Sequence, residues 1–170
     1  MAKKTLRLRD FARLKHITMK KFLLLFIALT LNSVQAQEVK TFTYFQNDTL
    51  KLDLDLYLPK KKAGEKIPLI MFAFGGGFSG GERTSEKDFG LFMAQNGYAV
   101  ASISYSLYMK GKDFGCKGTL TEKIKAIQIG VSDMWQATAF MIENADKYNL
   151  DTSKIFISAI SAGAQIGFHA

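Results

Sequence analysis

Two short segments combine residue types that could together perform nucleophilic chemistry. Ser161 lies within residues 159–163 (AISAG), where the residues two positions before and after the serine are both small. A tight turn between a strand and a helix needs small residues there and holds the serine hydroxyl exposed. The second segment is Gly75-Gly76-Gly77, whose backbone N–H groups can approach a substrate closely because glycine has no side chain. Together they indicate attack by a serine on a carbonyl group whose developing charge the N–H groups stabilise.

Each segment also has an ordinary interpretation. A glycine-rich loop can cradle a phosphate, but residues 75–77 lack the dinucleotide-binding spacing and no Lys-Ser/Thr follows them. A serine between a strand and a helix is often only an N-cap. The order of the two segments, with alternating strands and helices between them, favours the nucleophile. We therefore expect Ser161 to be the catalytic nucleophile and the N–H groups of Gly76, Gly77 and Ala162 to be oxyanion-hole donors.

Apolar patterning predicts the strands that position these segments. Residues 41–45 and 50–58 alternate apolar and polar side chains on either side of the turn-forming Asn47-Asp48. This alternation is typical of half-buried strands, and the tight turn predicts an antiparallel hairpin at a sheet edge. Three later runs are continuously apolar, which predicts strands buried on both faces of a parallel sheet: residues 67–74, 98–105 and 154–160.

Helices are expected between these strands. Residues 85–96 form a candidate helix that ends at Asn96-Gly97. Residues 120–148 show helical periodicity, with these apolar residues in register: Ile124, Ile127, Val131, Trp135 and Phe140. Another helix begins directly after Ser161. Strands that alternate with helices after an opening hairpin predict the α/β class, as a three-layer sheet with right-handed crossovers.

The basic character of the chain resides in its first residues. The net charge is +8, but residues 1–21 alone hold eight basic side chains and one acidic side chain. Residues 37–170 hold fifteen basic and fourteen acidic side chains, so no nucleic-acid surface is expected. The charge pattern is therefore a property of a leader segment.

This leader has the layout of a secretory signal peptide. Lys20-Lys21 precedes an apolar run of ten residues at 22–31, and Val34-Gln35-Ala36 places compact residues before a cleavage site after Ala36. A membrane span needs about 20 apolar residues, so we expect no stable span after cleavage. Met19 is the expected start of translation, with a long natural leader as the alternative. The sequence predicts an exported protein, periplasmic or extracellular, with a basic extension and signal peptide at 1–36 and a domain at 37–170.

The motifs and their order resemble the α/β-hydrolase superfamily, in the branch of carboxylesterase-type and hormone-sensitive-lipase-like enzymes. The resemblance runs from about Leu50 to Ala170 and rests on several segments, among them residues 54–59, 75–78, 96–100, 151–155 and 161–164. It implies hydrolysis of a small carboxylic ester through an acyl-serine intermediate, without a cofactor. Three positions depart from the family pattern: Phe74 replaces a histidine that supports the glycine loop, Ala159 replaces a glycine, and Ser104-Tyr105-Ser106 replaces Asp-Tyr-Arg. The first change is expected to reshape the loop, and the third to remove an ion pair.

The resemblance also implies a catalytic acid and a histidine after the serine in chain order. Nine residues follow Ser161, and they contain His169 but no Asp or Glu. Eight positions along a helix correspond to about 12 Å, whereas a general base must lie within about 3 Å of the proton it removes. His16 lies in the leader, and Asp133, in the middle of a helix, is expected to pack or to form hydrogen bonds. We therefore expect a hydrolase domain that is incomplete after the serine, inactive as this chain, with strand 154–160 as an exposed, aggregation-prone edge.

Other functions remain compatible with the residues. One is a non-catalytic or degenerate hydrolase-fold protein, and another is a peptidase or a sugar-ester deacetylase that uses the same acyl-enzyme mechanism. Cys116 is the single cysteine, so no internal disulfide is possible. No His/Cys cluster has the spacing of a metal site, and we expect no metal. The pattern does not specify an oligomeric state.

Overall fold

The computed structural model describes residues 38–60, 64–112 and 118–170. Residues Gln37–Ala170 form one compact unit, distinct from Met1–Ala36. The predicted signal peptide with its cleavage after Ala36, and also Cys116, lie outside the described residues, so export stays a prediction. Within the described ranges, no helix is both long enough and apolar enough to cross a membrane.

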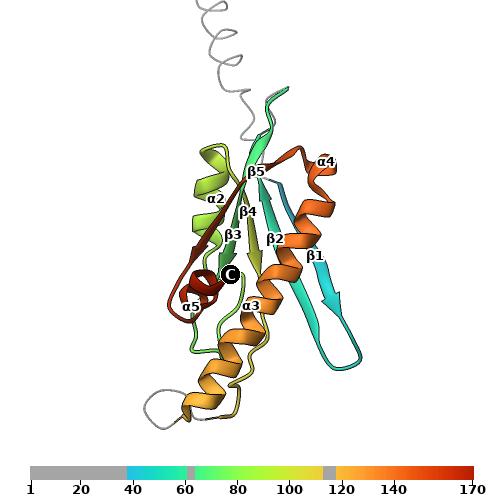
Figure 1. The fold of residues 1–170 in the computed structure, drawn as a ribbon. Coiled ribbons are helices and arrows are strands. Elements are labelled where there is room, and N and C mark those ends of the chain that lie inside the picture. The colour runs from blue at the N-terminus through green and yellow to red at the C-terminus, as the bar shows by residue number, and fades with distance from the viewer. Residues whose placement is uncertain (1–37, 61–63, 113–117) are drawn as a thin grey trace, which may run out of the picture. The chain divides into compact units, whose positions relative to one another are not determined.

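Five strands form one mixed sheet (Figure 1). In chain order they are β1 (Glu38–Gln46), β2 (Lys51–Leu58), β3 (Ile67–Ala73), β4 (Ala99–Ile103) and β5 (Leu150–Ala159), and in space they follow the order β1-β2-β4-β3-β5. The hairpin of β1 and β2 is antiparallel, and β4 is antiparallel to β2. Strand β3 is parallel to both β4 and β5. The predicted hairpin and parallel strands are confirmed. Because β3 and β5 are parallel neighbours, the segments that follow them meet at the carboxyl ends of these strands.

Helices cover both faces of this sheet. Because successive strand residues point to opposite faces, Leu54 and Tyr57 of β2 face different layers. Helix α2 (Lys87–Gln95) covers the Tyr57 face, where Gly90 lies against the Tyr57 ring. Helices α3 (Leu120–Glu143) and α5 (Ala162–His169) cover the other face, and the short α4 (Ala145–Tyr148) follows α3. The predicted three-layer α/β arrangement is confirmed.

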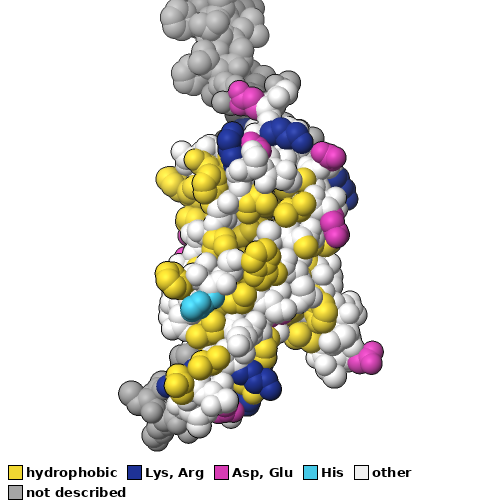
Figure 2. All heavy atoms as spheres, in the orientation of Figure 1, with side chains coloured by type: hydrophobic (Ala, Val, Ile, Leu, Met, Phe, Trp, Pro, Cys, Tyr) yellow, Lys and Arg dark blue, Asp and Glu magenta, His cyan; other side chains and the backbone are white. Residues whose placement is uncertain are grey.

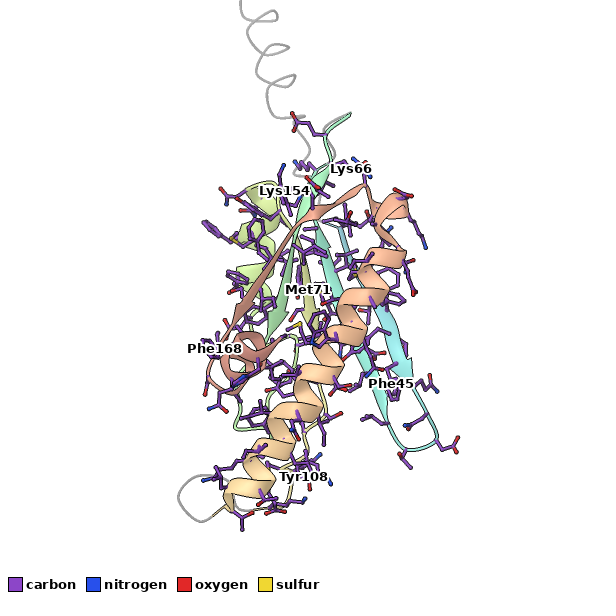
Figure 3. The ribbon with its side chains drawn as sticks, viewed as in Figure 1. Phe45, Lys66, Met71, Tyr108, Lys154 and Phe168 are labelled. Atoms are coloured by element: carbon purple, nitrogen blue, oxygen red, sulfur yellow. The ribbon has the colours of Figure 1, made fainter. Side chains whose placement is uncertain are left out.

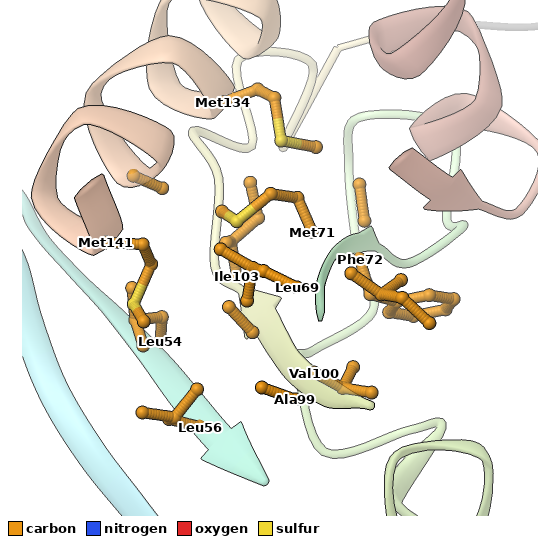
Figure 4. Packing of buried hydrophobic residues seen from close by; sticks show 14 of the residues in the cluster. Leu54, Leu56, Leu69, Met71, Phe72, Ala99, Val100, Ile103, Met134 and Met141 are labelled. Atoms are coloured by element: carbon orange, nitrogen blue, oxygen red, sulfur yellow. The ribbon is translucent and has the colours of Figure 1, made fainter. Parts of the chain in front are cut away.

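The core between α3 and the sheet is built from large side chains on both layers. Figure 4 shows Met134 and Met141 of α3 facing Leu54, Met71 and Ile103 of the sheet, and all five are at most 1% exposed. Full burial of each such side chain contributes about 1.5–3 kcal/mol relative to exposure. This packing fixes α3 across β2, β4 and β3.

The face that α3 turns to the sheet differs from the predicted one. Ile124 and Trp135, expected on the apolar face, are 46% and 58% exposed. The core side instead carries mostly small residues and methionines: Ala126, Gly130, Met134, Ala137 and Met141. Small residues occupy these positions because the helix lies close to both the sheet and α5, which leaves little room for a side chain. The helix is also shorter than predicted, since it ends at Glu143 and Asn144 separates it from α4.

Strands β2 and β5 also differ from the prediction in their burial. The polar side of β2 was expected to face solvent, but Asp55 and Tyr57 are only 4% and 2% exposed because α2 and the loop before it cover them. The continuous apolar run of β5 predicted burial on both faces of the sheet. Phe156 and Ile157, which point to opposite faces, are however 50% and 43% exposed. Among the described residues no strand pairs with the outer side of β5, so the predicted exposed edge is confirmed.

Candidate active site

Ser161 occupies a strained turn between β5 and α5. Its backbone has φ 50° and ψ −113°, a conformation that costs a non-glycine residue of order 1–3 kcal/mol. The turn is held on both sides, because Ile160 N donates to Ala73 O at 3.1 Å and Gln165 N donates to Ser161 O at 3.2 Å. The Ser161 side chain is exposed and forms no capping hydrogen bond, so the N-cap interpretation does not describe it.

The residues beside Ser161 are small because α5 begins directly against β3. A side-chain carbon at Gly163 would lie 2.2 Å from Ala73 O and 2.5 Å from Phe74 O. One turn later, a side-chain carbon at Gly167 would lie 2.7 Å from Ile157 Cγ2. The requirement for a small residue two positions after the serine is therefore confirmed, and its cause is the carbonyl groups at the end of β3.

The glycine loop that follows β3 lies against Ser161. A side-chain carbon at Gly75 would lie 3.2 Å from Ser161 Cβ. Gly76 and Gly77 have φ values of 135° and 62°, which favour glycine, and Ser79 N and Gly80 N both donate to Gly76 O at 3.1 Å. The sequence order predicted this meeting of loop and serine, and the geometry confirms that the two segments are adjacent.

Three backbone N–H groups at this junction have no backbone acceptor among the described residues. Within the described ranges, the N–H groups of Gly76, Gly77 and Ala162 donate to no other group of the chain. Ala162 is the first residue of α5, and the N-terminal end of a helix carries a partial positive charge that favours anions. The junction can therefore stabilise negative charge beside the Ser161 hydroxyl.

An aromatic pair supports the entry of the glycine loop. Tyr105 Oη donates to Phe74 O at 2.9 Å, and the two rings stack with centroids 4.4 Å apart. Burial raises the pKa of Tyr105 to about 12, so the phenol keeps its proton and acts as the donor at neutral pH. Phe78 contacts the same Tyr105 ring edge-on at 6.1 Å. These contacts support the loop at Phe74, where β3 ends and the glycines begin.

The segment after β4 is fixed from two sides. Asp133 Oδ2 of α3 accepts a hydrogen bond from Ser106 N at 2.7 Å, and Met109 N donates to Phe78 O at 2.9 Å. Burial raises the pKa of Asp133, while its hydrogen bond from Ser106 acts in the opposite direction. The predicted hydrogen-bonding role of Asp133 is confirmed, and this role connects α3 to the glycine loop through the segment after β4.

The exposed lysines are spread along the molecule and do not form one basic patch. Figure 3 shows Lys66 and Lys154 at the end of the sheet opposite to Tyr108, which lies beside the first turns of α3. Lys112 Nζ lies 3.6 Å from the centre of the Tyr108 ring, and it also pairs with Glu122 at 3.3 Å. The lysines thus form separate pairs along the molecule, in agreement with the near-neutral charge of residues 37–170.

His169 lies at the opposite end of α5 from Ser161. It lines a groove of about 400 Å3, together with four side chains of α3: Ile124, Ile127, Gln128 and Val131. His169 is the sole histidine among the described residues, and the separation along α5 corresponds to about 12 Å. The described part of the chain therefore places no histidine beside Ser161, as predicted. It also contains no cluster of three His, Cys, Asp or Glu side chains that could hold a metal ion.

Sequence reasoning missed two side chains that support the glycine loop, Tyr105 and Arg83. Arg83 follows the loop, and its Nε lies 3.0 Å from Asp55 Oδ2 of β2. The available signal was Asp55 itself, since a carboxylate on a strand that becomes covered needs a partner. Nothing in the local spacing indicates which cation supplies it.

Comparison with known proteins places the chain in a family. A family model described as BD-FAE matches residues 54–169. The chain belongs to the BD-FAE family. The matched region contains both the glycine loop and Ser161, so the candidate site lies within the part that defines the family.

Curated relatives of this BD-FAE chain are larger proteins. The "Crystal protein" of Dictyostelium discoideum is 30% identical over 114 residues, which cover 66% of this chain and 20% of that protein. The probable isoprenylcysteine alpha-carbonyl methylesterase ICMEL1 of Oryza sativa subsp. japonica is 31% identical over 113 residues, covering 66% of this chain and 23% of that protein. The chain thus spans about a fifth of the length of the curated relatives it matches.

Solved structures share the fold of this BD-FAE chain. The esterase Est2 of Thermogutta terrifontis is 24% identical with a TM-score of 0.60, and the match covers 79% of this chain and 44% of that one. A bacterial heroin esterase is 21% identical with a TM-score of 0.58, and the match covers 92% of this chain and 45% of that one. The chain therefore has a partial α/β-hydrolase fold and spans under half of these structures.

Proposed function

We propose that this chain carries the nucleophile and the oxyanion donors of a carboxylic-ester hydrolase. The observation that supports it most directly is the strained backbone of Ser161, held beside the glycine loop at the start of α5. Strained conformations persist where the surrounding structure enforces them, and they concentrate at functional sites. The esterase names of several relatives support the same class of substrate.

The proposed reaction proceeds through an acyl-serine intermediate. Ser161 Oγ loses its proton to a general base and attacks the ester carbonyl carbon, and the carbonyl electron pair moves to the oxygen. The N–H groups of Gly76, Gly77 and Ala162 stabilise that oxyanion, and each such donor contributes about 2.7–4 kcal/mol to the transition state. The tetrahedral intermediate collapses, and the alcohol leaves with the proton. Water then attacks the acyl-serine by the same steps in reverse, which releases the acid and regenerates Ser161.

The general base of this reaction comes from outside the described residues. His169 lies too far along α5 from Ser161 to take its proton. Asp133 lies on another helix, α3, and accepts the hydrogen bond from Ser106 N. A serine hydroxyl without a base is a weak nucleophile, so oxyanion donors and substrate binding alone leave a residual acceleration of about 10³–10⁴-fold over water. In this proposal the described residues therefore supply the nucleophile and the oxyanion donors, and not the base.

The test is hydrolysis of 4-nitrophenyl acetate and butyrate by the complete gene product and its Ser161→Ala variant. We expect Ser161→Ala to lower kcat by at least about a thousandfold, because the acyl acceptor is lost. Ser158→Ala, three residues earlier on β5, is the matched control and should retain activity. A fluorophosphonate probe should label Ser161 in the wild type and in the Ser158→Ala control. It should not label the Ser161→Ala variant. Retention of activity and labelling by Ser161→Ala would contradict the proposal.

A second candidate function is binding without catalysis, on the same fold. The observation in its favour is that the described residues place no histidine beside Ser161. A folded complete gene product that neither hydrolyses esters nor reacts with the fluorophosphonate probe would support this function. Cleavage of matched 4-nitroanilides at rates similar to the esters would instead indicate a peptidase, which uses the same acyl-serine chemistry.

A further inference from the structure

Arg83 attaches the exit of the glycine loop to the sheet at two points. Its side chain forms an ion pair with β2, where Nε lies 3.0 Å from Asp55 Oδ2 without the geometry of a hydrogen bond. Its backbone is held at β4, because Ser102 Oγ donates to Arg83 O at 2.7 Å. Side chain and main chain are thus both fixed, although Arg83 lies in the loop before α2, where a freely moving backbone would be expected.

The receiving site for Arg83 is a row of side chains across three neighbouring strands. Thr41 of β1 pairs in register with Asp55 of β2, and Asp55 pairs with Ser102 of β4. Thr41 Oγ1 donates to Asp55 Oδ1 at 2.6 Å, so each carboxylate oxygen of Asp55 has a different partner. The Asp55 side chain is 6% exposed and that of Arg83 is 25% exposed. Loss of Arg83 would leave a buried carboxylate with one hydrogen bond and no counter-charge.

A short series of contacts leads from Arg83 to Ser161. Gly81, two residues before Arg83, lies on the loop entry: a side-chain carbon there would lie 2.4 Å from Gly75 O. Gly75 in turn lies close to Ser161, because a side-chain carbon at Gly75 would lie 3.2 Å from Ser161 Cβ. The glycine loop between them is a compact turn closed on Gly76 O. A displacement of its exit therefore shifts Gly75, and with it the N–H groups of Gly76 and Gly77 relative to Ser161.

We propose that the Arg83–Asp55 pair is a positioning device that sets the oxyanion loop against Ser161. Arg83 Nη1 also lies 3.5 Å from Ser104 Oγ, directly after β4, so the guanidinium contacts a second strand end beside the loop. Arg83 and Asp55 touch no reacting atom. This inference rests on the proposed function of Ser161 and of the glycine N–H groups.

The first test is the kinetics of Arg83→Gln in the complete gene product with 4-nitrophenyl acetate. We expect kcat to fall by about tenfold to a hundredfold with little change in KM, because the misplaced donors act on the transition state and not on the bound substrate. Arg83→Lys, which keeps the charge, should retain a larger part of kcat. Lys51→Gln is the matched control, since it removes one charge from the exposed Lys51–Asp53 pair on the same strand β2. Equal kcat for Arg83→Gln and Lys51→Gln would overturn the proposal.

The second test does not need activity, and it separates this proposal from that of the hydrolase. Hydrogen exchange in Arg83→Gln should accelerate at the amides of residues 75–81, with those of β3 and β4 unchanged. A general loss of stability, with exchange faster throughout the sheet or unchanged at 75–81, would overturn the positioning role. Absence of ester hydrolysis in the wild type would count against the proposed function, and the exchange pattern would still decide the placement of the loop. If Arg83→Gln does not fold, Arg83→Lys and Asp55→Asn supply the same comparison.

Discussion

Gly163 determines how closely α5 can approach the sheet. A side-chain carbon at Gly163 would meet the carbonyl groups of Ala73 and Phe74, where β3 leads into the glycine loop. The distance between Ser161 and that loop is therefore set by the absence of a side chain at one position of the helix. Gly80, in the loop itself, has no atom within 4 Å of the place where a side-chain carbon would be.

We expect Gly163→Ala to destabilise the fold and Gly80→Ala to have little effect. The new methyl group of Gly163→Ala would lie 2.2 Å from Ala73 O, and relief of such a clash costs about 1–3 kcal/mol. Part of this cost is offset by the better helix propensity of alanine, by up to about 1 kcal/mol. Urea unfolding of the complete gene product, followed by circular dichroism, measures both variants. Equal midpoints for Gly163→Ala and wild type would show that α5 can move away from β3 without penalty.

At the residue scale, the sequence contains the site but not its supports. The adjacency of Ser161 and residues 75–77 could be predicted because each segment occupies a fixed place at the end of a strand, whereas their catalytic roles stay a prediction. Arg83 and Tyr105 could not, because their partners Asp55 and Phe74 are 28 and 31 positions away in the chain. Those pairings depend on the register between strands, which no local spacing records.

Helix α3 shows at the scale of an element how a periodic pattern can indicate the wrong face. Its large apolar residues repeat with helical spacing, yet Trp135 is 58% exposed and its neighbour Met134 is 1% exposed. A side-chain carbon at Gly130 would lie 2.6 Å from Ile166 Cδ1, so the side towards α5 must carry a small residue. Sequence periodicity weights residues by hydrophobicity, whereas close packing between two helices and a sheet selects them by size. The existence of the helix was therefore predictable, and its orientation was not.

Substitutions at adjacent positions of α3 distinguish these two orientations. We expect Met134→Ala to lower the free energy of unfolding by about 2–5 kcal/mol, because it removes a buried side chain between α3 and the sheet. Trp135→Ala should change it by no more than about 0.5 kcal/mol, as is usual for a surface position. Denaturant titration of the complete gene product measures both. A larger loss for Trp135→Ala would show either that this residue is buried in the complete protein or that the α3 orientation described here is wrong.

The strands followed their patterns more closely than the helices did. The sequence located β2 by the alternation at 50–58, and it located β3 and β4 by the continuous apolar runs at 67–74 and 98–105. In a strand every second side chain points to the same face, so the sequence shows directly whether one face or both are buried. The covered side of β2 was not predictable, since Asp55 and Tyr57 are polar enough to face water. Their burial is a consequence of α2 and the loop before it, which are positioned by tertiary contacts alone.

At the scale of the whole described unit, the face over α3, β5 and α5 carries several exposed apolar side chains. Figure 2 shows hydrophobic side chains gathered on the face over α3, β5 and α5, beside the histidine. Ile157 of β5, which lies against Gly167 of α5, is 43% exposed, and Phe168 of α5 is 86% exposed. They adjoin the outer edge of β5, whose backbone groups have no strand partner among the described residues. An apolar surface next to an open strand edge favours association between copies.

We expect this chain, expressed by itself, to aggregate, and Phe156→Lys to increase the yield of soluble monomer. A lysine on the open strand keeps the edge charged and opposes pairing with another copy. Phe92→Lys is the matched control, because Phe92 is 61% exposed on α2, which packs on β2 and β4 and not on the open strand β5. Size-exclusion chromatography with light scattering measures the soluble species. A monodisperse, cooperatively melting wild-type chain would contradict the expectation.

The strand order also governs when the site can form during folding. Strand β3 pairs with β4, which follows within about thirty residues, and with β5, where Ala73 lies beside Ala159 across 86 positions of chain. Pairings at such long sequence separation are slow, because the entropy of closing the loop is lost before the contact forms. During synthesis, the glycine loop leaves the ribosome well before Ser161 does. The candidate site can therefore form only after β5 has paired with β3, because Ser161 reaches the glycine loop through that pairing.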